Sequence, residues 1–258
     1  MRVLWLCAHP EERSLNGALR DEGVRHLTAA GHDVRVSDLY AMKWNPVVDV
    51  EDFGHDRADR LLVGEAAHGA HDAGALAPDI VAEQHKLAWA DTLVVQFPLW
   101  WYGMPAILKG WFDRVFVKGF AFGLHDAHGN QLRYGEGRLA GKRAMVLVTA
   151  GARASGLEPR GVNGGLLDLL FPLHHGTLWY VGMDVLPPFL VHGADRLDAQ
   201  GYERVATALR ERLDGLPHAA PLPFRHQNHG DYDEDLVLLP ELSPGVEGPG
   251  AHYRQAGE

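Results

Sequence analysis

The sequence predicts an α/β fold: a doubly wound, five-stranded parallel sheet followed by an extended C-terminal tail. Short apolar runs alternate with amphipathic spans along the chain, which is typical of strands and helices that follow one another in a parallel sheet. The run over residues 3–7 is continuous, which is the pattern of a strand buried on both faces, whereas Val34 and Val36 alternate with polar neighbours. Beyond Gly215, proline and glycine dominate and the amphipathic pattern ends.

The first third of the chain contains two predicted strands and one well-defined helix. Residues 3–7 form a continuous apolar run and predict the first strand. Ser14 is a suitable N-cap for the helix that follows, and Gly31 is a suitable residue just beyond its end. Residues 33–39 predict the second strand. The weakly patterned stretch up to Val94 is expected to hold a long connection and one helix ending near Ala88.

Later elements repeat the alternation of strand and helix. The further strands are expected at residues 92–97, 144–149 and 185–191, and the further helices at residues 107–117, 166–173 and 199–213. Pro187 and Pro188 interrupt the last strand, and the polar, glycine-rich residues 119–141 indicate a loop. Lys109 and Arg114 are interpreted as a solvated helical face.

Length and composition limit the class of protein. No internal repeat or second hydrophobic cycle is visible, so we predict one domain over residues 1–215 and a tail over residues 216–258. The formal charge of −10, without any lysine or arginine block, argues against a nucleic acid or an anionic membrane as partner. Cys7 is the only cysteine, and no apolar run approaches transmembrane length. We therefore expect a cytoplasmic protein with no integral membrane segment.

The candidate ligand-binding residues lie in three loops at the carboxyl ends of strands, because open α/β sheets bind ligands there. The first follows residues 3–7 and leads into a helix N-terminus, which suits an anion such as phosphate. His9 and Ser14 add donors there, and Arg13 adds a positive charge. The alternative is that Ser14 only caps the helix while His9 is solvated. Neither GxGxxG nor GxxxxGK[ST] occurs, so no nicotinamide-type or P-loop fingerprint is present.

The second loop, within residues 94–122, is aromatic. Leu99, Trp100, Trp101 and Tyr102 offer a flat apolar surface at the end of a strand, and a flat cofactor such as a flavin fits such a surface. Burial in a core or at a dimer contact is the alternative role for these aromatic residues. The third loop, residues 149–152, consists of small residues that let a planar ring approach the backbone. Together the three loops predict a flavin site.

Two segments resemble a known family closely. AHPEERSLNGAL (residues 8–19) and QFPLWWYGMPAILKGWFDRVFVKGFAF (residues 96–122) are similar to the flavodoxin-like NAD(P)H:quinone oxidoreductases of the DT-diaphorase type. The resemblance implies a flavodoxin-like fold and a homodimer with its active site at the interface. It also implies FAD as cofactor, with FMN as the alternative. The implied reaction is a ping-pong, two-electron reduction of quinones, and of nitro or azo compounds, in which hydride from NAD(P)H passes through flavin N5.

The resemblance also implies roles for individual residues. The residues that match the family's flavin-binding loops are His9, Arg13, Ser14, Leu15, Asn16, Ala18, Pro98, Leu99, Trp100, Trp101, Tyr102, Thr149, Ala150, Gly151 and Ala152. Mammalian members have tyrosine and histidine after the third loop, where this chain has Leu157 and Asn163. Asn163 can donate a hydrogen bond but cannot take up a proton. Tyr102 and Asn163 are therefore the catalytic candidates, with Tyr102 as a possible substrate contact.

Two other classes of protein stay open at this point. A flavodoxin-like electron-transfer or regulatory subunit would bind flavin without efficient reductase activity. A metal enzyme is suggested by histidine pairs such as His125-x-x-His128 and His226-x-x-His229, but these lack the HExxH form and a supporting cysteine set. We therefore predict no catalytic metal site, and we expect these histidines to be solvated.

Overall fold

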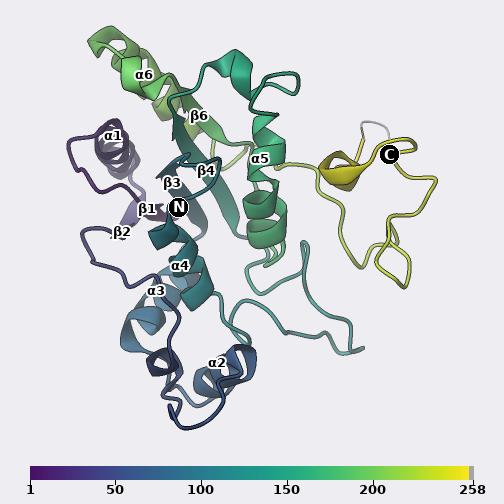
Figure 1. The fold of residues 1–258 in the computed structure, drawn as a ribbon. Helices are drawn as coiled ribbons and strands as arrows, with labels where there is room; N and C mark the ends of the chain where they lie inside the picture. The colour runs from purple at the N-terminus through teal and green to yellow at the C-terminus, as the bar shows by residue number, and fades with distance from the viewer. Residues whose placement is uncertain (256–258) are drawn as a thin grey trace.

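A computed structural model describes residues 1–255. Its centre is a parallel sheet with the strand order β2-β1-β3-β4-β5, and β6 also pairs with β4 (Figure 1). The strands are β1 (Arg2–Cys7), β2 (Asp33–Asp38), β3 (Thr92–Pro98), β4 (Arg143–Ala150), β5 (Asp184–Val185) and β6 (Phe189–His192). The α-helices are α1 (Leu15–Ala29), α2 (Val63–Asp72), α3 (Pro78–Trp89), α4 (Ala106–Val115), α5 (Leu166–Leu173) and α6 (Ala199–Asp214). The predicted fold class is confirmed, since this strand order defines the flavodoxin-like arrangement.

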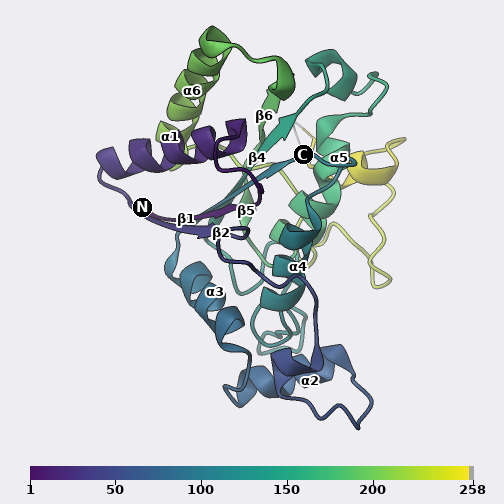
Figure 2. The same cartoon turned by 60° about the vertical axis from the view of Figure 1, so that its left-hand side comes forward.

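Helices cover both faces of the sheet (Figure 2). Helices α1 and α6 pack on one face, where Trp5 and Leu19 belong to one hydrophobic cluster together with Leu209. Helices α3, α4 and α5 cover the other face, where Leu87 and Trp111 belong to a second and larger cluster. Every residue of β3 is buried, because β3 lies in the middle of the sheet with a helical layer on each side. The continuous apolar runs of the sequence are explained by this two-sided burial.

Most predicted elements are confirmed within a few residues, and three differ from the prediction. The fifth position of the sheet is divided into β5 and β6, because Pro187 and Pro188 lie between them and proline cannot donate to a ladder. The stretch before β3 holds two α-helices, α2 and α3, instead of one. Helix α5 continues into a π-helical turn, His174–Trp179, which the 3.6-residue pattern does not reveal.

Arg114 is a correction to the sequence analysis, which placed it on a solvated face. Its side chain is only 3% exposed and lies against the Trp44 ring, 4.5 Å from the ring centre. Its guanidinium donates to the buried Asp52 at 2.6 Å and to Asp79 at 2.7 Å. The ion pairs connect helix α4, through Arg114, to Asp52 in the connection after β2 and to Asp79 at the start of α3. Lys109 lies on the exposed side of α4, paired with Asp113 at 2.5 Å.

The C-terminal segment from residue 216 to residue 255 contains one short 3₁₀ helix, Gly248–His252, and no named strand. It extends beyond α5, away from α1 and β2 (Figure 1). Phe224 and Arg225 are buried in it, and Arg225 donates to the carbonyl oxygen of Ala251 at 3.1 Å and to Ser243 at 2.9 Å. Among residues 1–255, no helix combines the length and apolarity needed to cross a bilayer.

Candidate functional site

A cleft of about 240 Å³ lies at the carboxyl edge of the sheet, where the loops after β1, β3 and β4 meet. The loop after β6 closes one side of it. The lining residues are His9, Ser14, Leu15, Asn16, Pro98, Leu99, Trp100, Thr149, Ala150, Gly151, Ala194 and Asp195. The parallel pairing of β1 with β3 and of β3 with β4 brings these loops to the same edge. Three segments that are far apart in the sequence therefore line one cleft.

The loop after β1 turns tightly into α1. Ser14 is the N-cap, and its Oγ accepts a hydrogen bond from the Gly17 backbone at 3.1 Å. A Cβ at Gly17 would lie 1.8 Å from the carbonyl oxygen of Glu12, so only glycine allows this close approach. The first turn of α1 therefore presents its positive dipole end to the cleft. Such an end suits an anionic group.

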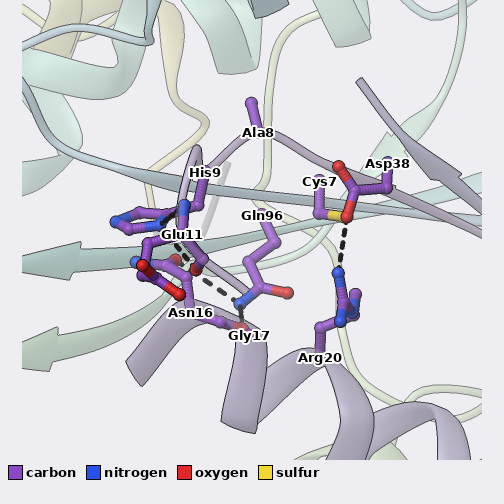
Figure 3. Close-up of a pocket in the computed structure, with 9 residues that line it drawn as sticks. All are labelled: Cys7, Ala8, His9, Glu11, Asn16, Gly17, Arg20, Asp38 and Gln96. Atoms are coloured by element: carbon purple, nitrogen blue, oxygen red, sulfur yellow. Dashed lines mark hydrogen bonds and ion pairs between the residues drawn. The ribbon is translucent and has the colours of Figure 1, made fainter. Parts of the chain in front are cut away.

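Asn16 connects two of the loops through a buried network. Its side-chain amide donates to Thr149 Oγ1 at 2.9 Å, while Gln96 Nε2 donates to the Asn16 carbonyl oxygen at 2.7 Å (Figure 3). Trp5 Nε1 donates in turn to Gln96 Oε1 at 2.7 Å. Because Gln96 and Trp5 lie on β3 and β1, the network fixes the α1 end of the cleft to the sheet. The sequence analysis missed both residues, although a glutamine inside an apolar strand is a signal that could have revealed one of them.

The loop after β3 is a tight turn with exposed aromatic side chains. The Gly103 amide donates to the Trp100 carbonyl oxygen at 3.0 Å, and Trp101 and Tyr102 between them have positive φ of 50° and 60°. Trp101 is 98% exposed and Tyr102 is 49% exposed. Trp100 faces the loop after β1, with its ring 6.2 Å from that of His9. Burial in the core of this chain therefore does not account for the aromatic turn.

The two catalytic candidates lie side by side. The Tyr102 hydroxyl donates to Asn163 Oδ1 at 2.9 Å, although the two residues are 61 positions apart. Asn163 is held by its backbone amide, which donates to the Gly156 carbonyl oxygen at 3.0 Å. Leu157, at the position where mammalian members have tyrosine, is buried. The hydroxyl and the amide can both form a hydrogen bond to a polar group beside the aromatic turn.

The loop after β4 touches the loop after β6. A Cβ at Gly151 would lie 2.7 Å from Asp195 Oδ1, so the small residue at position 151 lets Asp195 reach the cleft. Arg196 donates to the Gly151 carbonyl oxygen at 2.7 Å, and the Gly193 amide donates to the Ala152 carbonyl oxygen at 2.9 Å. Asp195 was missed by the sequence analysis, because β6 is too short and too interrupted to mark the loop that follows it.

Some predicted residues lie outside the cleft lining: Arg13, Ala18, Trp101, Tyr102, Ala152 and Asn163. Arg13 is exposed and forms an ion pair with Glu11 at 2.9 Å, so its positive charge is paired with the carboxylate of a neighbouring residue. Ala18 lies in the first turns of α1 and accepts a hydrogen bond from Tyr202 at 3.4 Å. Ala152 follows the lining residue Gly151, while Trp101, Tyr102 and Asn163 lie beyond the lining on the aromatic-turn side.

Cys7 lies below the first loop in a much smaller space of about 10 Å³ (Figure 3). Burial, followed by the charge of Asp38, raises the pKa of its thiol to about 12. Arg20 donates to Asp38 at 2.5 Å in the same place. A thiol in this state is not a nucleophile at neutral pH.

The cleft fits the parts of a flavin nucleotide. The first turn of α1 suits the anionic phosphate, the small residues 149–151 admit a planar ring edge, and Trp100 and Leu99 offer an apolar wall. The fold and this cleft together define a doubly wound, ligand-binding α/β protein.

Comparison with known proteins gives a more specific assignment. The family described as having the flavodoxin-like fold matches residues 1–213. A ribosyldihydronicotinamide dehydrogenase-like protein of Penicillium crustosum is 45% identical over 98% of this chain and 96% of its own length. The NAD(P)H dehydrogenase [quinone] 1 of Cavia porcellus is 36% identical over 86% of this chain and 80% of its own. A crystal structure from Klebsiella pneumoniae, provisionally described as a quinone reductase, has a TM-score of 0.94 and 50% identity, and covers 98% of this chain and 99% of its own.

The chain therefore belongs to the flavodoxin-like fold family, among its NAD(P)H:quinone oxidoreductase relatives. The resemblance drawn from the sequence is confirmed.

Proposed function

We propose that this protein binds a flavin in the cleft and catalyses the two-electron reduction of quinones by NAD(P)H. The observation that carries the proposal is the meeting of an anion-binding helix end, an exposed aromatic turn and a small-residue turn at one edge of the sheet. Relatives named as quinone dehydrogenases match over most of the chain. Nitro and azo compounds are further candidate acceptors.

A bound flavin would supply the redox chemistry, accepting hydride from the reduced nicotinamide and passing two electrons to the acceptor. The chain's own residues would bind the flavin and orient it. We assign the phosphate-bearing arm to His9, Ser14, Leu15 and Asn16, and the ring to the aromatic and small-residue turns. Arg13, Ala18 and Ala152 are proposed to support the same loops. Asn163, held by Tyr102, would orient a polar group at the mouth of the site.

FAD is proposed ahead of FMN from the length of the chain and its resemblance to the longer members of the family. Mass analysis of the flavin released from the purified protein decides between the two. A visible spectrum of the same sample comes first. Colourless protein that stays colourless after incubation with FAD and with FMN contradicts the proposed cofactor site.

A homodimer with the active site at the interface is proposed from the resemblance to the family, and the exposed aromatic turn supports it. The cleft is smaller than the 300–1,000 Å³ of typical ligand sites. Trp101 is almost fully exposed in the aromatic turn, and apolar residues in such a position mark binding surfaces. We further propose that residues 1–215 form the catalytic domain and residues 216–258 an appended tail. Sedimentation of the purified protein tests the oligomeric state.

The decisive test is steady-state oxidation of NADH and of NADPH with menadione as acceptor. A catalyst turns over many equivalents, whereas a flavodoxin-like carrier or regulatory subunit does not, so the assay separates the two candidate classes. Because some relatives are named ribosyldihydronicotinamide dehydrogenases, reduced N-ribosylnicotinamide belongs in the same assay as a third donor.

The double variant Trp101→Ala/Tyr102→Ala tests the aromatic turn. It should lose turnover or lose flavin, because the apolar surface beside the ring is removed. Val47→Ala is a suitable control, since Val47 is an exposed apolar residue on the distant connection after β2. Full flavin content together with full NAD(P)H oxidation in the double variant contradicts the assigned role of the turn.

A further inference from the structure

A second group of candidate ligands lies where the loop before β4 meets the C-terminal segment. Glu136, His226 and His229 form it, and we call it the loop–tail cluster. One potential ligand atom from each of the three side chains lies within 4.8 Å of the other two. None of the three lines the flavin cleft. The spacing of His226 and His229 is visible in the sequence, whereas Glu136 comes to lie beside them only in the folded chain.

Hydrogen bonds hold the two segments of the cluster in place. Asn228, between the two histidines, donates from its side-chain amide to the Gln131 carbonyl oxygen at 3.1 Å and also to the Glu136 carboxylate. Arg133 donates to Gln227 at 2.5 Å. The contacts come from both sides of the cluster, so its geometry does not depend on one flexible side chain. A carboxylate oriented by a neighbouring amide is typical of the outer shell of a metal site.

The two imidazoles lie parallel, with their centres 4.2 Å apart and their planes 8° apart. His229 Nε2 is 3.0 Å from the Glu136 carboxylate. His226 packs edge-on against Trp179, and its Nδ1 is buried without a hydrogen-bond partner among residues 1–255. A buried ring nitrogen with no partner is costly, and the hydrogen bonds of these residues do not relieve it.

We propose that Glu136, His226 and His229 bind one divalent transition-metal cation, Zn²⁺ in the first place, through two imidazole nitrogens and one carboxylate oxygen. This nitrogen and oxygen donor set suits Zn²⁺ more than Mg²⁺ or Ca²⁺, which prefer oxygen ligands alone. His229 is about half exposed, so an ion can enter from solvent and keep water as a further ligand. The site would be structural, since it lies apart from the cleft.

The geometry favours a shared cation over a simple ion pair. An ion pair between His229 and Glu136 would leave His226 without any role, whereas a shared cation uses all three side chains.

A cation at this position would connect two segments that have little regular structure of their own. Residues 118–141 contain no helix or named strand, and the segment after α6 contains one short 3₁₀ helix. Binding that occurs only in the folded state stabilises that state. Zn²⁺ is therefore expected to stabilise the attachment of the C-terminal segment.

The test is competition for Zn²⁺ between the purified, chelator-treated protein and a chromophoric chelator of micromolar affinity. Wild type should withdraw one equivalent, and its C-terminal segment should become more resistant to limited proteolysis when Zn²⁺ is added. His229→Ala and Glu136→Gln should lose that equivalent and the added resistance. Asn228→Ala should weaken binding roughly 10-fold, as loss of an outer-shell contact does.

The matched control is His125→Ala/His128→Ala, which removes an exposed histidine pair of the same spacing. This control should keep the equivalent of Zn²⁺. The proposal is overturned if wild type withdraws no Zn²⁺, if His229→Ala still binds it with full affinity, or if the control pair loses it. Neither readout uses flavin or turnover, so the outcome is independent of the function proposed above.

Discussion

Two buried histidines make the protein's stability depend on pH in a window where carboxylates contribute little. His174 is fully buried in the π-helical turn after α5, and both of its ring nitrogens lack a partner among the described residues. Burial lowers its pKa from 6.5 to about 4. His175 lies between the rings of Phe171 and Tyr134. Burial, and then His252 on the tail, lower its pKa to about 4 as well.

The direction in which stability changes with pH depends on which state, folded or unfolded, binds protons more readily. Both folded-state pKa values lie below the unfolded value, so the unfolded chain takes up protons first as the pH falls. Stability is complete above about pH 6.5 and is lost as the pH falls from there toward 4. One pKa unit corresponds to about 1.4 kcal/mol, so at pH 5 each histidine lowers the free energy of unfolding by about 2 kcal/mol. A loss of about 4 kcal/mol is a large part of a typical total of about 5–15 kcal/mol.

The assay is urea unfolding at pH 7 and at pH 5, followed by tryptophan fluorescence. His174→Leu removes one titrating group from the core, so it should reduce the stability lost between the two pH values by about 2 kcal/mol. His125→Leu changes an exposed histidine and should leave that loss unaltered. A loss in His174→Leu equal to that of wild type refutes the link between burial of this histidine and acid sensitivity. Carboxylates with lowered pKa, such as Glu22, act mainly below pH 4.5 and do not obscure the comparison.

Three further substitutions test the site and the fold. Tyr102→Phe removes the hydrogen bond at the mouth of the cleft, so turnover with menadione should fall by up to about tenfold while flavin content stays constant, as absorbance and steady-state rates will report. Gly151→Ala places a methyl group against Asp195 and should lower flavin retention after gel filtration; the additional change Asp195→Ala should restore it. Asp52→Ala leaves the buried Arg114 partly unpaired and should lower the free energy of unfolding by about 3–5 kcal/mol in urea, and an unchanged midpoint would contradict the importance of the pair.

The sequence predicts the sheet well because the strands are buried on both faces. The apolar runs of β1, β3 and β4 are continuous, so neither a helical nor an alternating pattern competes with them. The helix N-cap at Ser14 is also correct, because capping is a local interaction. The three site loops follow from these elements, since a parallel sheet brings the carboxyl ends of its strands to one edge.

Features that depend on distant partners were not predictable from local pattern. Arg114 reads as a surface residue until Asp52, 62 positions away, is placed beside it. Gln96 and Asn16 form one network only after β3 and α1 are packed together. Asp195 follows a strand that two prolines interrupt, so no periodic signal marks its loop. In each case the missing information is a contact across the fold and not a property of the segment.

The aromatic turn violates the local rules that the rest of the chain obeys, and this violation is informative. A tight turn with positive φ at both central positions normally has glycine or asparagine there, because a side chain in that conformation is strained. This chain has Trp101 and Tyr102 instead, at φ of 50° and 60°. Such residues cost about 1–3 kcal/mol each. Burial does not compensate for this cost, since Trp101 is 98% exposed.

Neither turn propensity nor core packing therefore explains the two aromatic residues, in agreement with the flavin contact and the dimer contact proposed above. A flat ring beside the turn, a second protomer over it, or both would cover the exposed surface. Glycine at position 101 would relieve the strain, so Trp101→Gly should fold at least as stably as wild type while losing flavin or turnover. A variant that loses stability and keeps turnover would show instead that the turn serves the fold.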